Sequence, residues 1–274
     1  MYRPYGFDSI PPVVKNLLIL NALTWLATLA FLSMGWADLP STLGLFYPGS
    51  VYFKPLQFST YMFMHGSFTH LLYNMLALWM FGSLLESYWG PKRFLLFYLT
   101  TAIGAALMHI GVTAWEIHGL QQQIDLYKSN PDVSQLSLLL QEDHTLFIKP
   151  EIQRFLDLFL ADPNNSQIIQ ESKDLVDLLP IRKMNVPVVG ASGAIFGILM
   201  AGFLLYPNTE MMILFFPFPI KVKYLVSVLA FMELYEIVGN KPFDNVAHFA
   251  HLGGMLFGWI LVKYWNKTDR NRFY

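Results

Sequence analysis

Long apolar runs separated by polar segments dominate the pattern of residues along the chain. A helix needs about 20 mostly apolar residues to cross the hydrocarbon core of a bilayer, which is about 30 Å thick. Six stretches come close to that length, at roughly residues 13–35, 68–85, 94–115, 190–206, 224–239 and 246–265. The pattern therefore predicts an all-α membrane protein with six spanning helices.

The positions of the Lys and Arg residues predict the orientation of these helices. Short loops rich in Lys and Arg stay in the cytoplasm. With a cytoplasmic N-terminus, ten cations outside the longest loop fall on the inner side and only Lys54 and Lys241 on the outer side. Because the number of spans is even, both ends of the chain are expected on the inner side.

A polar insertion, residues 116–185, interrupts the pattern between the third and fourth spans. It holds eleven acidic and six basic residues. Apolar residues recur at helical spacing over 148–159 and again over 168–179, where Pro180 is expected to end the helix. We expect a small acidic helical subdomain on the outer face, which divides the chain into 1–115, 116–185 and 186–274. A partly disordered first half, starting at Gln121–Gln123, is the open alternative.

Composition supports a protein solvated by lipid and excludes several other classes. Of the 274 residues, 54% are hydrophobic and 14% are charged, whereas soluble domains carry about 25% charge. The net charge of −1 and the lack of a basic stripe give no sign of a nucleic-acid partner. The absence of cysteine excludes disulfides, cysteine-ligated metals and thiol catalysis. No transit peptide is evident, which favours a bacterial plasma membrane.

Polar residues inside spans are energetically expensive and usually mark a site, and three clusters of them stand out. The fourth span opens with Gly190-Ala191-Ser192-Gly193, in which small neighbours leave the hydroxyl accessible. Taken alone, a serine that bonds back to its own helix is the more common explanation.

The sixth span contains Ala247-His248-Phe249-Ala250-His251. Histidine is the side chain best suited to take a proton from a serine. The two histidines are three residues apart, about 60° around a helix, so they need not share a role. We expect His248 to be the base and His251 to be a packed residue.

The second span begins with His65 and continues through His70 and Asn74. The latter two are four residues apart and share a helix face, so they could donate hydrogen bonds to a developing oxyanion. Alone, they would be explained as ordinary interhelical hydrogen bonds. Topology, however, places the starts of the second, fourth and sixth spans on one side, at similar depth. Small residues allow these helices to approach closely; they are Gly193, Gly197 and Ala201 on one helix and Gly254 and Gly258 on the other.

In combination these motifs resemble the rhomboid family of intramembrane serine proteases, over roughly Val13–Trp265 without the insertion. The resemblance implies a six-helix rhomboid bundle and a catalytic dyad of Ser192 and His248 without a third carboxylate. It also implies an oxyanion hole formed by His70, Asn74 and the Ser192 backbone N–H, with no metal or cofactor. Its remaining implications concern supporting residues: Gly190 and Gly193 in the serine motif, a ring at Phe196 stacked on the catalytic histidine, and a structural Glu86.

Two departures from the family pattern affect these expectations. Leu56-Gln57 stands where the family has Trp-Arg, so the contacts of that loop must differ. His251 stands where the family's Gly-x-x-x-Gly usually starts, and the glycine pair is shifted to Gly254 and Gly258. His251 therefore remains open as a competing base, and His248 is preferred because it follows Ala247.

The sequence thus predicts a serine endopeptidase that cuts membrane-protein substrates, within their transmembrane segments and near the outer face of the lipid bilayer. Substrate would enter past the fifth span and a lid at Asn240–Asn245. Asp244 could complete a triad but is expected to be exposed. The alternatives are an inactive rhomboid-like protein that binds membrane helices and a metal or haem protein, whose ligands would be His65, His70, His109, His248 and His251.

Overall fold

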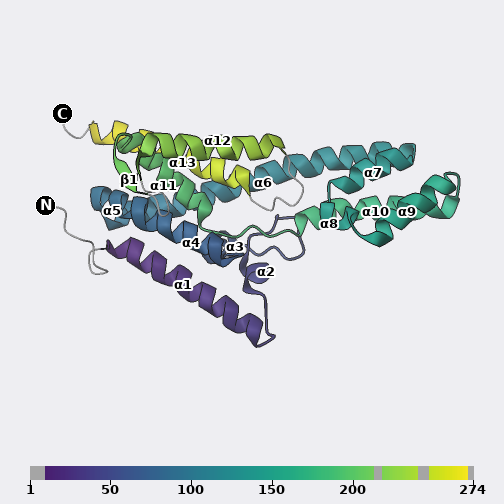
Figure 1. The fold of residues 1–274 in the computed structure, drawn as a ribbon, viewed down its shortest axis with the longest axis horizontal. Helices are drawn as coiled ribbons and strands as arrows, with labels where there is room; N and C mark the ends of the chain where they lie inside the picture. Colours follow the sequence, from purple (N-terminus) through teal and green to yellow (C-terminus); the bar gives the residue numbers. More distant parts are fainter. Residues whose placement is uncertain (1–9, 213–217, 240–246, 271–274) are drawn as a thin grey trace.

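The computed structural model describes residues 10–212, 218–239 and 247–270, which are almost entirely helical (Figure 1). In chain order the elements are α1 (Pro12–Ser33), α2 (Leu39–Leu43), α3 (Gln57–Thr60), the 3-10 helix η2 (Tyr61–Phe63), α4 (Phe68–Ala77), the π-helix η3 (Leu78–Gly82), α5 (Ser83–Trp89), α6 (Pro91–Ser129), α7 (Val133–Gln141), α8 (His144–Phe147), α9 (Pro150–Ala161), α10 (Ser166–Met184), α11 (Ser192–Leu205), β1 (Glu210–Met212), β2 (Pro219–Lys221), α12 (Val222–Gly239) and α13 (His248–Arg270). The two short strands pair antiparallel just before α12.

The described parts of the six predicted stretches are mainly helical. Within the described residues, three helices are long and apolar enough to cross a membrane, namely Pro12–Ser33, Phe68–Trp89 and Pro91–Ser129, while Ser192–Leu205 is apolar but shorter. The chain is therefore an integral membrane protein built mainly from helices. The start of α1 and the end of α13 lie at the same end of the molecule (Figure 1). The count of six spans and the cytoplasmic location of both termini remain predictions.

The first helix is fixed at its start by a buried carboxylate. Pro12 occupies its first position, where a missing N–H costs nothing. The next two N–H groups, of Val13 and Val14, donate to the two oxygens of Glu86 at 2.9 and 2.8 Å. Glu86 is buried on α5, so it satisfies helix donors that lack an intrahelical partner. This contact gives Glu86 a structural role, as the sequence suggested.

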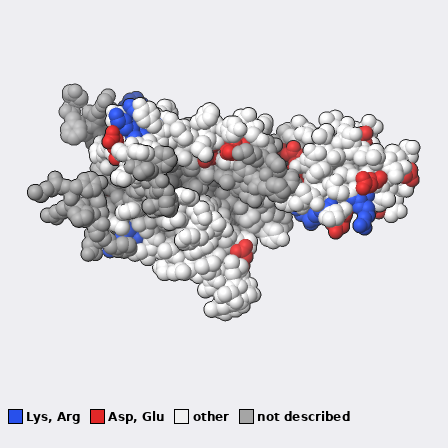
Figure 2. Space-filling view, in the orientation of Figure 1, with Lys and Arg blue, Asp and Glu red and all other residues white. Residues whose placement is uncertain are grey.

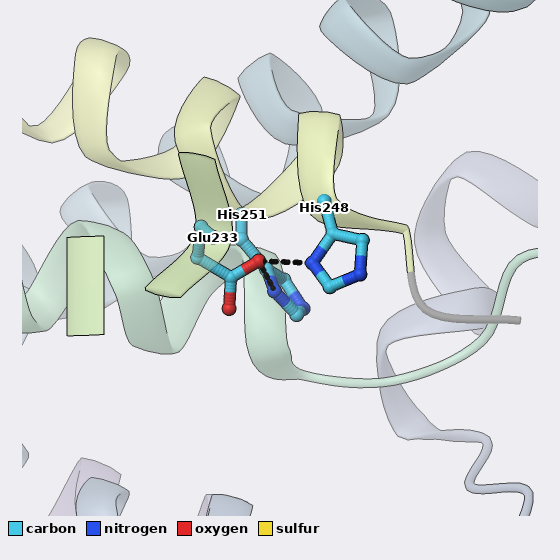
Figure 3. A group of neighbouring side chains, drawn as sticks. All are labelled: Glu233, His248 and His251. Carbon is cyan, nitrogen blue, oxygen red and sulfur yellow. Dashed lines mark hydrogen bonds and ion pairs between the residues drawn. The ribbon is translucent and has the colours of Figure 1, made fainter. Parts of the chain in front are cut away.

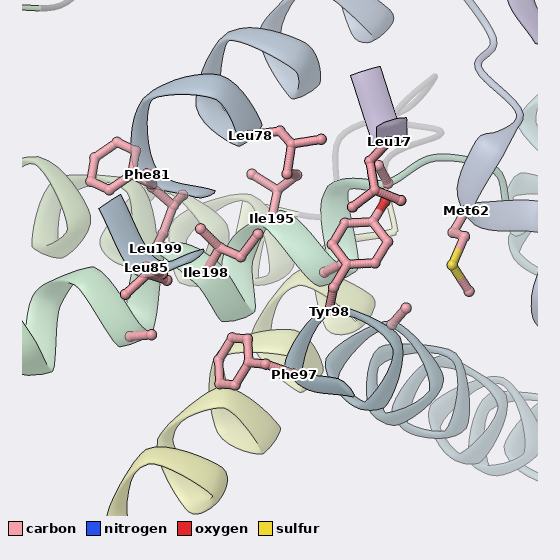
Figure 4. Packing of buried hydrophobic residues seen from close by; sticks show 14 of the residues in the cluster. Leu17, Met62, Leu78, Phe81, Leu85, Phe97, Tyr98, Ile195, Ile198 and Leu199 are labelled. Atoms are coloured by element: carbon pink, nitrogen blue, oxygen red, sulfur yellow. The ribbon is translucent and has the colours of Figure 1, made fainter. Parts of the chain in front are cut away.

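Helix α11 lies at the centre of the bundle, against both α6 and α13. An added Cβ at Gly193 would lie 2.5 Å from Cβ of Ala105 on α6. On the other side, an added Cβ at Gly254 would lie 1.9 Å from the carbonyl oxygen of Gly193. Backbone therefore meets backbone between α11 and α13, as the small-residue pattern predicted. Around these contacts, Leu17, Leu78, Phe97, Ile198 and other apolar side chains form the main core (Figure 4).

The insertion packs around a second hydrophobic core at the far end of α6. That helix has 39 residues, or roughly 58 Å at 1.5 Å per residue, and continues well beyond a bilayer's thickness. Its last turns and α7–α10 enclose a cluster that includes Leu120, Ile124, Leu136, Phe159 and Val176. Charged side chains gather over this part of the surface (Figure 2).

Two details of the insertion differ from the sequence-based expectations. The disordered alternative for its first half is wrong, because Gln121–Gln123 lies within α6, which continues to Ser129. The last insertion helix, α10, does not end at Pro180 but runs on to Met184. Pro180 is buried inside the helix, so packing compensates for the hydrogen bond that it cannot donate.

Candidate active site

A strained turn presents Ser192 at the start of α11. Gly190 has φ +123°, a backbone conformation that residues other than glycine rarely adopt. Its N–H donates to the carbonyl oxygen of Tyr61 at 2.9 Å. A Cβ at this position would lie 2.6 Å from Cε1 of His70, so the turn also needs glycine for space. The hydroxyl of Tyr61 in turn donates to the carbonyl of Ala102 at 2.7 Å, which ties this turn to α6.

Ser192 is the first residue of α11 and faces His251 of α13. Nε2 of His251 lies 2.7 Å from Oγ of Ser192, within hydrogen-bond distance. The N–H groups in the first turn of a helix have no intrahelical partners, and this end of the helix carries partial positive charge. Ser192 therefore combines a partnered hydroxyl with backbone donors beside it.

The expectation that His248 faces the serine is corrected by this geometry. Nδ1 of His248 lies 2.6 Å from Oε2 of Glu233, and the ring centroids of His248 and His251 are 6.2 Å apart. The residue brought against Ser192 is His251, one turn further along α13. The physical reason is the contact between Gly254 and Gly193, which sets the rotation of α13 against α11.

The ring of Phe196 supports the same arrangement. It stacks on His251 with centroids 4.3 Å apart and an interplanar angle of 8°. Phe196 lies four residues after Ser192, so it is on the same face of α11, one turn along. The stacking expected for the catalytic histidine is thus found on His251.

Glu233 of α12 was missed by the sequence reasoning and lies between the two histidines (Figure 3). Its Oε2 is 2.6 Å from Nδ1 of His248 and 3.0 Å from Nδ1 of His251. The second contact is electrostatic rather than a well-directed hydrogen bond, because Nδ1 of His251 is buried and makes no hydrogen bond among the described residues. The available signal was an acidic residue in the middle of an apolar stretch.

His70 and Asn74 belong to α4, which lies beside the turn that precedes Ser192. The ring of His70 and Oγ of Ser192 both flank Gly190. Asn74 is buried, and its Nδ2 has no hydrogen-bond partner among the described residues. A buried amide donor without a partner is uncommon, so this one is available to an incoming acceptor. His65 is also buried and packs edge-on against His70, with ring centroids 5.0 Å apart.

Comparison of the sequence with known proteins identifies the family to which the chain belongs. The rhomboid domain model matches residues 52–118 and 165–267, together more than half of the chain. The chain belongs to the rhomboid family. It is 25% identical over 213 residues to the mitochondrial rhomboid protein 1 of Saccharomyces cerevisiae, covering 77% of this chain and 43% of that protein. It is 31% identical over 99 residues to the rhomboid-family protein YdcA of Bacillus subtilis, covering 35% of this chain and 48% of that protein.

The chain thus spans less than half the length of each of these relatives. The two segments that match the rhomboid domain contain all the site residues described above, from His70 to His251. The unmatched residues between them, 119–164, fall within the insertion. Residues 119–164 are therefore an addition to the part of this chain that matches other rhomboids, whereas residues 165–185 of the insertion lie within the match.

The loop that precedes the second predicted span shows how this rhomboid replaces a family feature. Gln57 is buried and accepts hydrogen bonds from the N–H groups of Phe46 and Lys54 at 3.4 and 3.0 Å. Its amide group donates to the carbonyls of Thr42 and Tyr52. One glutamine therefore organises the loop in which the family has Trp-Arg. The expected lid at Asn240–Asn245, with Asp244, lies outside the described residues.

Proposed function

We propose that this rhomboid is an intramembrane serine endopeptidase with Ser192 as nucleophile and His251 as general base. The observation that carries the proposal is the 2.7 Å approach of His251 Nε2 to Ser192 Oγ, under the stacked ring of Phe196. A nucleophile and base within 2.6–3.2 Å of each other are the geometric signature of nucleophilic catalysis. The earlier expectation of His248 as base is replaced by this assignment.

Catalysis would begin when Oγ of Ser192 attacks the carbonyl carbon of a peptide bond and its proton passes to Nε2 of His251. The histidinium then gives that proton to the leaving amine, which leaves an acyl-enzyme on Ser192. A water molecule loses a proton to His251 and hydrolyses the ester, and the serine is regenerated. Ser192, His251 and the water molecule account for every proton transferred in these steps.

Glu233 would assist by its charge. Its Oε2, 3.0 Å from Nδ1 of His251, favours the tautomer that carries the proton on Nδ1. This tautomer leaves the lone pair of Nε2 free to receive the serine proton. The carboxylate also stabilises the histidinium that forms during the reaction.

The oxyanion of the tetrahedral intermediate would be held by the His70 ring, the Asn74 amide and the backbone N–H of Ser192. The free Nδ2 of Asn74 supports this assignment, since a donor without a partner in the resting state is ready for the transition state. Loss of one such donor typically lowers turnover by about 10²- to 10³-fold. Asn74→Ala should fall in that range.

The substrates would be membrane proteins whose transmembrane helices unwind locally at the site. An intact helix holds its carbonyls in hydrogen bonds, so a cleavable peptide bond requires a break in the helix. We place the cut near the outer end of the substrate span, and the insertion on the same outer side. Bacterial plasma membrane stays the predicted location, although one of the relatives is mitochondrial.

The test is cleavage of a single-span model substrate in liposomes by the wild type and three alanine variants. Ser192→Ala and His251→Ala should each lower turnover by about 10³-fold or more. His248→Ala should be far less damaging. The opposite ranking of the two histidine variants would overturn the assignment of the base.

A serine-directed fluorophosphonate probe separates an inactive protein from an unsuitable substrate. Labelling that is lost in Ser192→Ala and in His251→Ala would show an activated serine even when the model substrate is not cut. Absence of labelling in a folded wild-type protein would instead favour the alternative of a rhomboid-like protein that binds helices without cutting them.

A further inference from the structure

Glu233, His248 and His251 form a cluster with the composition of a metal site (Figure 3). One ligand atom from each residue lies within 4.8 Å of the other two. The two histidines are three residues apart on α13, and the carboxylate comes from α12. Two imidazoles and a carboxylate from separate helices are a ligand set used by zinc sites in proteins.

The two distances from the Glu233 carboxylate to the imidazoles need only a small change to match those around an ion. Zinc lies about 2.0–2.1 Å from each ligand in a tetrahedral site, which places the ligand atoms about 3.3 Å from one another. In the structure Oε2 of Glu233 is 2.6 Å from Nδ1 of His248 and 3.0 Å from Nδ1 of His251. Outward shifts of well under 1 Å would bring these two distances to the spacing of a zinc site, and the ligand atoms of the two histidines lie within 4.8 Å of each other.

Burial and charge favour a cation at this point. The three side chains are 10–13% exposed, so the Glu233 carboxylate is largely removed from water. A buried carboxylate is stable only when it is paired or coordinates a metal. Its ion-pair partners in the described part of the chain are the two histidines, which carry positive charge only when protonated.

His251 supplies a second, independent observation. It is buried, and its Nδ1 makes no hydrogen bond among the described residues although it points toward the carboxylate of Glu233. Its other nitrogen, Nε2, is held by Ser192 at 2.7 Å. Histidines that bind metals usually donate the second ring N–H to a neighbouring oxygen, and Oγ of Ser192 is such an oxygen.

We propose that Glu233, His248 and His251 bind a Zn²⁺ ion, and that this ion holds the protease in an inactive state. A neutral imidazole has one nitrogen lone pair and one N–H. When Nδ1 of His251 gives its lone pair to zinc, the ring proton must reside on Nε2. Nε2 then donates to Ser192 and can no longer accept its proton. The inhibition rests on the proposed function, whereas zinc binding itself does not.

The direct test measures zinc binding by the wild-type protein in the absence of substrate, so the result does not depend on proteolysis. Equilibrium dialysis of purified protein against ZnSO₄ should give about one bound ion per chain. Co²⁺ as a spectroscopic substitute should give the strong visible absorption of a tetrahedral site. Absence of saturable binding would overturn the proposal.

Variants of the ligands locate the ion. In the same assay, His248→Ala and Glu233→Gln should each weaken zinc binding by at least about tenfold. Glu233→Gln keeps the size of the side chain, so weaker zinc binding by this variant is not explained by lost packing. It therefore controls for a folding defect in His248→Ala. The matched control is His118→Ala, an exposed histidine on α6 that should leave binding unchanged. Equal binding by the His248→Ala and His118→Ala proteins would place the ion elsewhere.

Activity supplies the second readout. Zinc should inhibit substrate cleavage by the otherwise wild-type protein, and a chelator should restore it. His248→Ala should raise the half-inhibitory zinc concentration by at least about tenfold. Zinc binding without inhibition would refute the switch while leaving the site intact. Failure of the wild type to cut any substrate would count against the proposed function and not against the zinc site.

Discussion

The contact between Gly254 on α13 and Gly193 on α11 holds the two proposed catalytic helices together. A methyl group at Gly254 would lie 1.9 Å from the carbonyl oxygen of Gly193 and 2.9 Å from its carbonyl carbon. Both atoms belong to helix backbone, so neither can turn aside as a flexible side chain would. The substitution Gly254→Ala must therefore push the two helices apart.

The size of the shift follows from the distances. Carbon and oxygen normally approach to about 3.3–3.6 Å, so α11 and α13 would separate locally by about 1.5 Å. Ser192 precedes Gly193, and His251 lies one turn before Gly254, so the 2.7 Å contact between Oγ and Nε2 would stretch toward about 4 Å. That exceeds the 2.6–3.2 Å reach of general-base catalysis, which contributes about 10²- to 10⁴-fold to rate. Overpacking of this kind also costs about 1–3 kcal/mol of stability.

The assay is cleavage of a single-span substrate in liposomes, together with thermal unfolding of each variant. Gly254→Ala should lose about 10²-fold or more in turnover. Gly258→Ala should lose less, because its methyl would lie 2.8 Å from the Gly197 oxygen. Gly111→Ala is the control, since nothing lies within 4 Å of its added methyl. Wild-type turnover by Gly254→Ala, or a larger loss in Gly258→Ala, would refute the reasoning.

Three further predictions follow from single contacts. Gly190→Ala should abolish labelling by a serine-directed probe, because φ +123° is strained for alanine and the added methyl would lie 2.6 Å from His70. Full labelling of this variant would contradict the prediction. Glu86→Ala should lower the free energy of unfolding by about 1–2 kcal/mol, since two N–H groups at the start of α1 lose their acceptors. An unchanged midpoint of thermal unfolding would contradict a stabilising role for these two hydrogen bonds. In the insertion, burial raises the pKa of Asp143, but hydrogen bonds from Arg182, Thr145 and the Leu146 N–H outweigh it and hold that pKa below its usual value. A lowered folded pKa contributes stability that is present above the unfolded pKa, about 3.9, and is lost as pH falls through the folded value. The protection factors for amide hydrogen exchange in the insertion, taken relative to the intrinsic rates at each pH, should therefore fall in acid, and Asp143→Asn should flatten that pH dependence.

Local pattern was sufficient for the helices, and it identified the serine and the two histidines from which the proposed site is built. The described parts of the six apolar stretches are mainly helical, because a continuous apolar run of that length has few other ways to satisfy its backbone in lipid. Ser192 stood out because its small neighbours, Ala191 and Gly193, leave the hydroxyl accessible. Gly193, Gly197, Gly254 and Gly258 indicated close helix packing, and the structure places backbone against backbone at two of those contacts.

The insertion and the loop before the second predicted span were less predictable. Whether Gln121–Gln123 is helical depended on burial of Leu120 and Ile124 against helices more than ten residues further along the chain. The role of Gln57 depended on four backbone groups brought together by the loop itself. Neither arrangement leaves a periodic signal in the sequence.

The identity of the histidine that meets Ser192 was decided only by the tertiary structure. His248 and His251 have the same chemistry, lie on the same helix and differ by about 60° in direction, so composition and spacing cannot separate them. The choice depends on how α13 is rotated against α11, which the contact of Gly254 with the Gly193 backbone determines. The place of Glu233 beside both histidines likewise depends on how α12 packs on α13. The sequence by itself therefore determined which helices and reactive groups the protein has, and interhelical packing determined which of those groups meet.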